Sequence, residues 1–296
     1  MKMRKDGATI SFDIVKVVLL SVTALLYTLP FIIIISGSFS DNSIVIRTGY
    51  GILPKGFSLN AYERLFQTPQ DIIQAYKMTF YYTAIGTSIG LMMIALTGYV
   101  ISRPEVKYRN TVSFLIYFTT IFGGGMVPWY LMYANVLGLR GNPIAIWFPG
   151  LMSPFLVIIM RTFIRESVPD AITESAKIDG AGHLTIFTRI VLPIIGPALA
   201  TVGLFLALGY WNDWFRASMF SLDSSTWSLQ FYLYNMLNAT QAMQRIAQEA
   251  SISMGDMPTE TLKMAMAVVA TGPVLLIYPF VQRYFISGIT IGAVKG

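Results

Sequence analysis

Six apolar segments divide this chain, and each has roughly the 20 residues that an α-helix needs to cross a lipid bilayer. Inside lipid the backbone N–H and C=O groups find no water, so they must bond to one another within a helix. The pattern therefore predicts an all-α fold, a polytopic membrane protein with six transmembrane helices. The expected spans cover about 14–35, 78–101, 111–131, 143–163, 186–208 and 262–285.

The composition agrees with a membrane location, because 54% of the residues are hydrophobic and only 12% are charged. A soluble domain carries about 25% charged residues. This chain has too little polar surface to cover a water-soluble globule. Its first apolar segment is longer than a signal-peptide core and no A-x-A-like cleavage site follows it, so we expect it to remain as the first helix.

The distribution of basic residues predicts how the spans are oriented. Lysine and arginine crowd segment 1–13, the turn 102–109 and the flanks of the loop 164–189, whereas the 54-residue segment 209–262 holds two. Basic residues favour the cytoplasmic side. We therefore expect the N-terminus, the loop 164–189 and the tail 286–296 to be cytoplasmic, with 209–262 outside and 14–285 forming the membrane domain. The net charge of +6 is explained by these membrane edges and does not indicate a nucleic-acid partner.

Glycine and proline interrupt several spans. Gly123–Gly125 and the following Pro128 predict a kink or break in the third span, and Pro149 with Gly150 predicts a bend in the fourth. Gly86 and Gly90 have the GxxxG spacing at which two membrane helices pack closely. That pair indicates helix packing rather than a substrate path.

The sequence contains almost none of the residue patterns that build a catalytic, metal or nucleotide site. It has no cysteine, one histidine and no Gly-Lys dipeptide, so thiol catalysis, a multi-histidine metal site and an ATP-binding P-loop are excluded. We expect no enzyme, no metal and no cofactor in this chain. No carboxylate or histidine lies in the middle of a span, which argues against a proton-coupled carrier. An autonomous secondary carrier or channel for a small polar solute stays as the alternative, and it would work when reconstituted alone.

The polar loop between the fourth and fifth spans contains a short predicted helix. Pro169 suits a first helical turn, Asp170 suits its positive end, and Gly180 and Gly182 can end it after Ile178. Ile172, Ala176 and Asp179 then share one side. By composition alone this is an ordinary loop with a helical turn.

The spacing within that loop is more specific. Glu174-Ser175-Ala176, then Gly180, then Ile190-x-Leu192-Pro193 resembles the EAA signature of permease subunits of binding-protein-dependent ABC importers, with Ser175 where the family usually has Ala. In that family the loop is a coupling helix that docks on a cytoplasmic ATPase. The resemblance gives an ATPase-coupling role to Ile172, Glu174, Ser175, Ala176, Lys177, Asp179, Gly180 and Ala181.

The likeness extends along most of the chain. The six-span layout, Trp211-Asn-Asp-Trp214 and the ending from Gln282 to Gly296 resemble the maltose-permease-G-like branch of carbohydrate importers, with most likeness to permeases for complex or acidic oligosaccharides such as alginate or aldouronate fragments. The resemblance implies the type I importer permease fold (MetI-like) in a bacterial plasma (inner) membrane. It also gives the tail residues Lys295 and Gly296 a second coupling role, to which a disordered end is the alternative.

The same resemblance implies partners. They are membrane lipids, an oligosaccharide substrate, one homologous permease, an extracytoplasmic solute-binding protein and two ATPase subunits that hold ATP and Mg²⁺. Within this chain the candidates for sugar contact are Tyr210, Trp211, Asn212, Asp213 and Trp214, because aromatic faces stack on sugar rings and amides or carboxylates bond hydroxyls. An aromatic anchor at the membrane interface is the other reading of this cluster, and the one that we favour.

Overall fold

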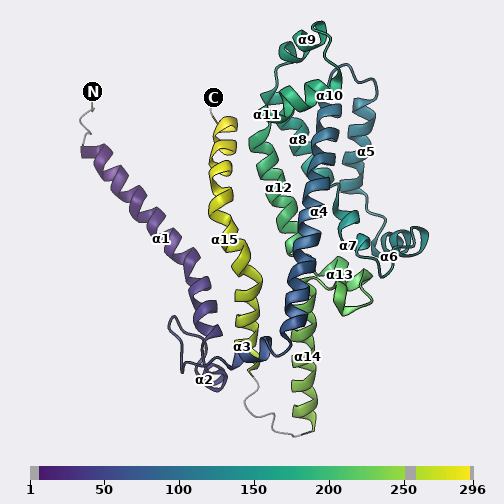
Figure 1. The fold of residues 1–296 in the computed structure, drawn as a ribbon. Helices are drawn as coiled ribbons and strands as arrows, with labels where there is room; N and C mark the ends of the chain where they lie inside the picture. Colours follow the sequence, from purple (N-terminus) through teal and green to yellow (C-terminus); the bar gives the residue numbers. More distant parts are fainter. Residues whose placement is uncertain (1–6, 251–257, 294–296) are drawn as a thin grey trace. The chain divides into compact units, whose positions relative to one another are not determined.

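The computed structural model describes residues 7–250 and 258–293, and within these ranges the chain is helical, with a single isolated bridge between Ser40 and Phe57. Figure 1 shows the helices in sequence order. The chain forms two compact units, one from residues 1–69 and 236–273 and the other from 70–235 and 274–296. The all-α prediction is confirmed.

The helices of the described ranges are as follows. They are α1 (Gly7–Ser38), α2 (Asn42–Thr48), α3 (Asn60–Leu65), α4 (Pro69–Ser102), α5 (Arg109–Ile121), α6 (Met126–Leu131), α7 (Ile144–Trp147), α8 (Pro154–Ser167), α9 (Asp170–Ile178), α10 (His183–Ile186), α11 (Leu192–Ile194), α12 (Gly196–Trp211), α13 (Phe215–Phe220), α14 (Leu229–Glu249) and α15 (Thr259–Ala293).

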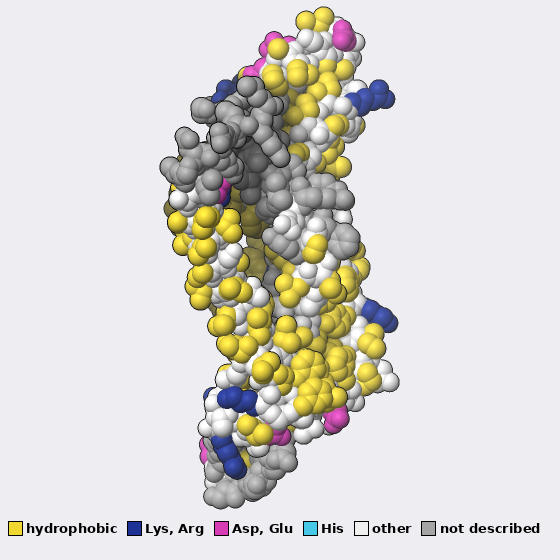
Figure 2. Space-filling view, turned by 90° about the vertical axis from the view of Figure 1, so that its left-hand side faces the viewer, with side chains coloured by type: hydrophobic (Ala, Val, Ile, Leu, Met, Phe, Trp, Pro, Cys, Tyr) yellow, Lys and Arg dark blue, Asp and Glu magenta, His cyan; other side chains and the backbone are white. Residues whose placement is uncertain are grey.

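Three helices are long and apolar enough to cross a membrane, within Ser11–Ser38, Pro69–Ser102 and Thr259–Ile277. Three further spans form only if each of three bent helix pairs is taken as one crossing, which gives up to six in the described residues. None of the most apolar window of α1 is buried inside the chain, so its side chains face lipid or another subunit. Hydrophobic side chains also dominate the face drawn in Figure 2, with only scattered charged groups.

The bends of the third and fourth spans lie at the predicted glycine and proline positions, and the fifth span has a further bend that was not predicted. The third span is interrupted between α5 and α6, and its two parts, Arg109–Ile121 and Met126–Val136, meet at 118°. Gly125 has a φ of 87°, a left-handed conformation that suits glycine, and Pro128 cannot donate a backbone hydrogen bond. The fourth span bends by 44° and the fifth by 83°, at Ile195 between Pro193 and Pro197. The third span is therefore a sharply turned helix pair: the break predicted at Gly123–Gly125 is present, and the size of the turn is what the sequence did not predict.

The first unit joins the start of the chain to the start of α15. The side-chain oxygen of Asn42 accepts hydrogen bonds from the backbone N–H groups of Glu260 (2.9 Å) and Thr261 (3.3 Å). The Tyr50 hydroxyl donates to the Glu260 carboxylate at 3.0 Å, and partial burial together with that carboxylate raises the pKa of Tyr50 to about 12. Asn42 thus caps α15 from a position 218 residues earlier in the chain.

Replacing Asn42 with alanine is expected to loosen the first turn of α15. A side-chain cap of this kind contributes about 1 kcal/mol, so amide exchange at Glu260 and Thr261 should accelerate about fivefold. Hydrogen–deuterium exchange of the purified protein measures it. Asn60→Ala is the matched control, because the Asn60 side chain is exposed at the start of α3 and makes no cap contact there. Equal exchange in both variants would contradict the cap.

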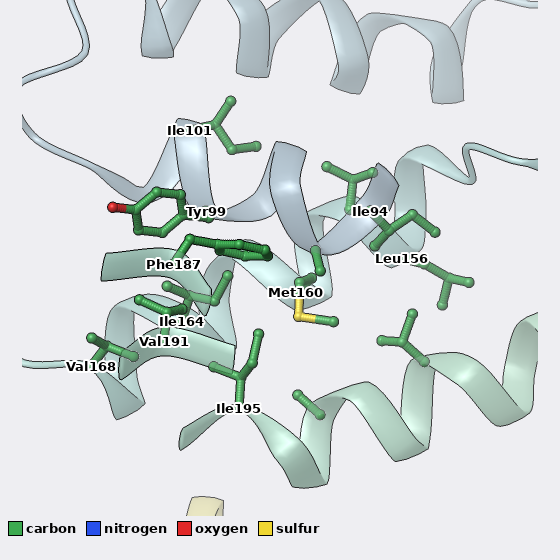
Figure 3. Close-up of a cluster of buried hydrophobic side chains, with 14 of the residues drawn as sticks. Ile94, Tyr99, Ile101, Leu156, Met160, Ile164, Val168, Phe187, Val191 and Ile195 are labelled. Atoms are coloured by element: carbon green, nitrogen blue, oxygen red, sulfur yellow. The ribbon is translucent and has the colours of Figure 1, made fainter. Parts of the chain in front are cut away.

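The second unit contains a hydrophobic core formed by α4, α8, α12 and the segment α10–α11. Figure 3 shows Tyr99 of α4 against Phe187, with ring centroids 5.3 Å apart and Met160 of α8 beside them. Val168 and Ile195 are also completely or almost completely buried in this cluster. The core continues to the end of α8, so the short helix α9 that follows is anchored on it.

Glycines let α4 approach its neighbours, which confirms the close-packing role predicted for Gly86 and Gly90. A Cβ atom at Gly86 would overlap the ring of Tyr210, and one at Gly90 would lie 2.8 Å from the backbone oxygen of Leu151. Gly98 is similar, because a Cβ there would lie 2.9 Å from Met160 Cγ. At these three positions α4 approaches its neighbours closely because no side chain stands between them.

Candidate functional site

The short helix α9 has the boundaries that the sequence predicted. Its end forms two hydrogen bonds that satisfy otherwise unpaired carbonyls: Gly180 N–H donates to Lys177 O (3.0 Å) and Ala181 N–H to Ala176 O (2.9 Å). This is the Schellman arrangement, in which the residue after the C-cap is left-handed. Gly180 fills that place with a φ of 81°. Gly182 has a φ of −73°, so the expectation that it also ends the helix through left-handed freedom was wrong.

A buried arginine fixes α9 to the end of α4. The Arg103 side chain is 2% exposed, and its terminal nitrogen donates to the Thr173 hydroxyl of α9 at 3.2 Å and lies 3.6 Å from the Asp170 carboxylate. Its Nε donates to Ser102 at 3.1 Å, and its guanidinium lies 5.2 Å from the centre of the Tyr99 ring. Charged donors form stronger hydrogen bonds than neutral ones. Arg103 therefore ties α9 to the same tyrosine that packs in the core.

A second contact joins the other end of α9 to the turn between α4 and α5. Lys177 forms an ion pair and hydrogen bond with Glu105. Partial burial alone would raise the pKa of Glu105, but the bond and charge of Lys177 outweigh it, so that pKa lies below its ordinary value. A lowered carboxylate pKa stabilises the folded state above the ordinary carboxyl range, and the stabilisation is lost as pH falls through the lowered pKa. The pair is therefore intact near neutral pH.

The outer side of α9 and of the following short helix α10, which contains Leu184, is free of such contacts and partly apolar. Ile178 is 86% exposed, Leu184 is 71% exposed, and Ile172 is 43% exposed. Glu174, Ser175, Asp179 and Gly180 are exposed beside them, whereas Ala176 and Ala181 pack partly against the core. The predicted coupling residues thus form two groups. Ala176 and Ala181 pack the loop against the core, and most of the others form an exposed outer face. Lys295 and Gly296 lie outside the described residues.

Replacing Gly180 with alanine is expected to destabilise this loop by about 1 kcal/mol, because an L-residue pays a steric penalty at a φ of 81°. Space is not the cause, since nothing lies within 4 Å of the position a Cβ would take. Gly182→Ala is the matched control: it meets equally open space but has an ordinary φ, so it should be neutral. Local hydrogen exchange at Ala181 measures the difference, and Gly180→Asn should be milder than Gly180→Ala.

The cluster after α12 does not present five side chains to one space. Tyr210 and Trp211 are each 3% exposed; the Tyr210 hydroxyl donates to Trp147 O at 2.9 Å, and Trp211 meets Phe80 edge-on at 5.2 Å. Asp213 is paired with Arg216 at 2.7 Å. Burial raises the pKa of Asp213, and Arg216 opposes that rise. These three residues hold the end of α12 in place.

The two remaining members, Asn212 and Trp214, are exposed. Trp214 is 42% exposed and stacks on Tyr234 of α14, which is 41% exposed, with ring centroids 4.7 Å apart. The Asn212 side-chain oxygen accepts a hydrogen bond from Gln230 at 3.2 Å. The start of α14 is held on α4, because Leu229 N–H donates to Thr79 Oγ1 at 2.7 Å. Two aromatic rings and two amides are thus positioned together by fixed helices.

Sequence reasoning missed Arg103, Glu105 and Thr173. The basic turn 102–109 indicated a cytoplasmic membrane edge, and nothing in its pattern separated the buried Arg103 from the exposed Lys107. Gln230 and Tyr234 were missed because they belong to α14, about 16 and 20 residues after Trp214. The described residues contain no group of three or more His, Cys, Asp or Glu that could hold a metal ion.

A helical membrane domain with broken spans and a short polar helix clamped between two of them defines a transporter permease. No protein-family model matches the chain. It is 38% identical over 286 residues to the polygalacturonan/rhamnogalacturonan transport system permease protein YtcP of Bacillus subtilis, covering 96% of this chain and 98% of that protein. It is 35% identical over 287 residues to protein LplC of the same organism, covering 96% and 95%. The trehalose/maltose transport system permease protein MalG of Thermococcus litoralis is 25% identical over 292 residues, covering 96% and 99%.

A solved structure is also similar. A chain of a bacterial ABC transporter involved in the import of the acidic polysaccharide alginate matches with a TM-score of 0.77 and 29% identity, covering 95% of this chain and 99% of that one. The chain belongs to the family of sugar-transport permeases of ABC importers. It is an inner-membrane transport subunit and not an enzyme, and membership implies ATP-driven partners and a solute-binding protein.

Proposed function

We propose that this permease imports acidic oligosaccharides, fragments of uronate polymers of the alginate, aldouronate or polygalacturonan kind. Two of the similar proteins described above support this proposal: one is a polygalacturonan/rhamnogalacturonan transport permease, and the other is part of an importer of the acidic polysaccharide alginate. The working complex contains a second homologous permease and two ATPase subunits that bind ATP and Mg²⁺. An extracytoplasmic solute-binding protein delivers the sugar, and this chain itself holds no cofactor.

In this proposal α9 is the coupling helix, and the clamp by Arg103 is the observation that carries it. An ATPase that grips Ile172, Ile178 and Leu184 would bury apolar surface that is now exposed. Movement of α9 would then pull on α4 through Arg103 and on the α4–α5 turn through Glu105. A loop held only by its chain ends would transmit little of that movement.

The coupling role proposed for α9 implies an orientation. With α9 on the ATPase side, the N-terminus, the loop 164–189 and the tail 286–296 are cytoplasmic, and segment 209–262 is outside. This agrees with the distribution of lysine and arginine in the sequence. The tail residues Lys295 and Gly296 belong to the same proposal as a second contact to the ATPases.

Within segment 209–262 the exposed group of Asn212 and Trp214, with Gln230 and Tyr234, is the proposed sugar contact. Stacked aromatic rings offer an apolar face, and the two amides offer donors and acceptors for hydroxyl groups. Tyr210, Trp211 and Asp213 support this group from the packed end of α12 and do not touch the sugar. These four side chains suit a transient contact with the sugar, since they lie on an exposed surface and do not enclose a pocket.

The proposal is tested with the complete importer in proteoliposomes, supplied with its binding protein. Uronate oligosaccharides should stimulate ATP hydrolysis and enter the vesicles. Glu174→Lys and Gly180→Asp should leave the complex assembled but separate hydrolysis from uptake, while Glu166→Lys, outside α9, should couple normally. Normal transport in both α9 variants would remove the coupling role. Uptake by this chain alone would favour an autonomous carrier or channel.

A further inference from the structure

Arg161 is a charged side chain without a counter-ion in the part of the chain that the structure describes. It belongs to α8, within the bent pair that forms the fourth span. Its Nε is buried from solvent and has no hydrogen-bond partner, and no carboxylate of the described residues pairs with its guanidinium. An arginine inside a membrane span is costly unless it meets an anion, a backbone oxygen or the interface. The nearby Arg103, whose side chain is buried, has such partners.

Beside Arg161 the surface is hollowed by a cavity of about 250 Å³ between α5 and α8. Two hydroxyl side chains, Ser113 and Tyr117, line it together with the arginine. Ser113 donates to Arg109 O at 2.6 Å, so its oxygen can only accept further bonds, whereas Tyr117 is 52% exposed. The rest of the lining is apolar and includes Phe114, Ile116 and Ile158. The cavity is thus lined by one cationic side chain, two hydroxyl side chains and an otherwise apolar surface.

The cavity lies close to the ends of three helices. Ser113 follows the start of α5 by four residues, and Arg161 precedes the end of α8 by six. At 1.5 Å per residue, both lie within about 9 Å of the helix ends. Ile101, next to the last residue of α4, lines the same cavity. The sequence predicts that the fourth span ends near residue 163, so we place the cavity where lipid headgroups meet acyl chains, with the basic turn of Lys107 and Arg109 at the same level.

We propose that this cavity binds the headgroup phosphate of an anionic phospholipid. Arg161 pairs with the phosphate and the Tyr117 hydroxyl donates to it, while an acyl chain lies on Phe114, which is 62% exposed. Basic pockets between membrane helices near the cytoplasmic side recognise such headgroups. The charge complementarity explains why an arginine without a protein partner is placed beside hydroxyl groups and open apolar surface.

Native mass spectrometry of the assembled importer, purified in mild detergent, tests the site. The wild-type complex should retain about one more phosphatidylglycerol than the Arg161→Gln complex. Arg165→Gln is the matched control, since Arg165 is exposed one turn further along α8 and should leave retention unchanged. Equal retention in wild type and Arg161→Gln, or a wild-type complex with no retained lipid, would overturn the proposal. The latter is the result expected if the second permease subunit covers the cavity.

A thermal unfolding series identifies the chemistry of the ligand. Added phosphatidylglycerol should raise the melting temperature of the wild-type complex, while phosphatidylcholine and inorganic phosphate at the same concentration should not. An equal shift with phosphatidylcholine would overturn charge recognition, and an equal shift with inorganic phosphate would overturn the lipid assignment. If Arg161→Gln does not fold, Ile158→Trp fills the cavity while keeping the charge, and it should lose the lipid as well. Retained lipid in that variant contradicts the site.

Discussion

Replacing Arg103 with alanine is expected to abolish sugar-stimulated ATP hydrolysis, although a fraction of the molecules should still assemble into the importer. The change removes the bond to Thr173, the ion pair to Asp170 and the contact with Tyr99, and it leaves a void where a 2% exposed side chain stood. Hydrogen bonds to charged groups contribute about 1.5–3 kcal/mol each, and the void adds to the loss. The Asp170 carboxylate is 59% exposed, so its ion pair adds little to this.

The control for this prediction comes from the same turn. Lys107 is exposed and contacts only the ring of Tyr108, at 5.4 Å, among the interactions described for it. Lys107→Ala should retain stimulated hydrolysis, and Arg103→Lys should retain a part, because lysine keeps the charge but not the forked geometry. The measurements are ATPase activity with and without sugar-loaded binding protein, and the melting temperature. Full stimulation in Arg103→Ala would contradict the coupling role proposed for the contact between Arg103 and α9.

Replacing Gly90 with alanine is expected to lower the stability of the second unit by about 1–3 kcal/mol, the usual range for overpacking. The added Cβ would lie 2.8 Å from the backbone oxygen of Leu151, and a backbone atom cannot rotate away as a side chain can. α4 would have to separate from the segment before α8, which would also disturb the nearby contact of Gly86 with Tyr210. The measurement is the melting temperature of the detergent-solubilised permease.

Gly209→Ala is the comparison for Gly90→Ala. Gly209 lies in α12 with nothing within 4 Å of its Cβ position, so alanine there should be neutral or, through its better helix propensity, slightly stabilising. The two changes add the same methyl group to a membrane helix. Similar melting temperatures for both variants would mean that the helices separate easily at Leu151, contrary to the packing described.

Local signals in the sequence predicted α9 and the close-packing glycines well. Pro169 and Gly180 bound a helix by rules that depend on a few neighbouring residues, and the structure places the boundaries there. The 118° turn after α5 was anticipated only as a break at Gly123–Gly125. Three glycines weaken a helix, but the direction in which the chain continues depends on distant partners, here the aromatic contacts of Trp129 and Tyr130 with Phe220.

Side-chain direction was the part of the site that the sequence could not supply. Consecutive residues at the end of a helix point in directions about 100° apart, so five neighbouring aromatic and polar residues cannot all face one ligand. Tyr210 and Trp211 turn inward and Trp214 outward. Arg103 shows the same limit, since its burial comes from Thr173, seventy residues away along the chain.

The cap that Asn42 places on α15 bears on the order in which a ribosome-bound chain can complete its packing. The cluster around Tyr99 and Phe187 needs no residue beyond Tyr210, so all its members exist well before synthesis ends. Asn42, by contrast, cannot form its hydrogen bonds until Glu260 and Thr261 have been synthesised and α15 has folded beside it. Domains pack as units when their residues become available. The short helix α2, made early in synthesis, therefore gains its contact with α15 among the last, and an interruption of synthesis before residue 260 leaves Asn42 without this partner.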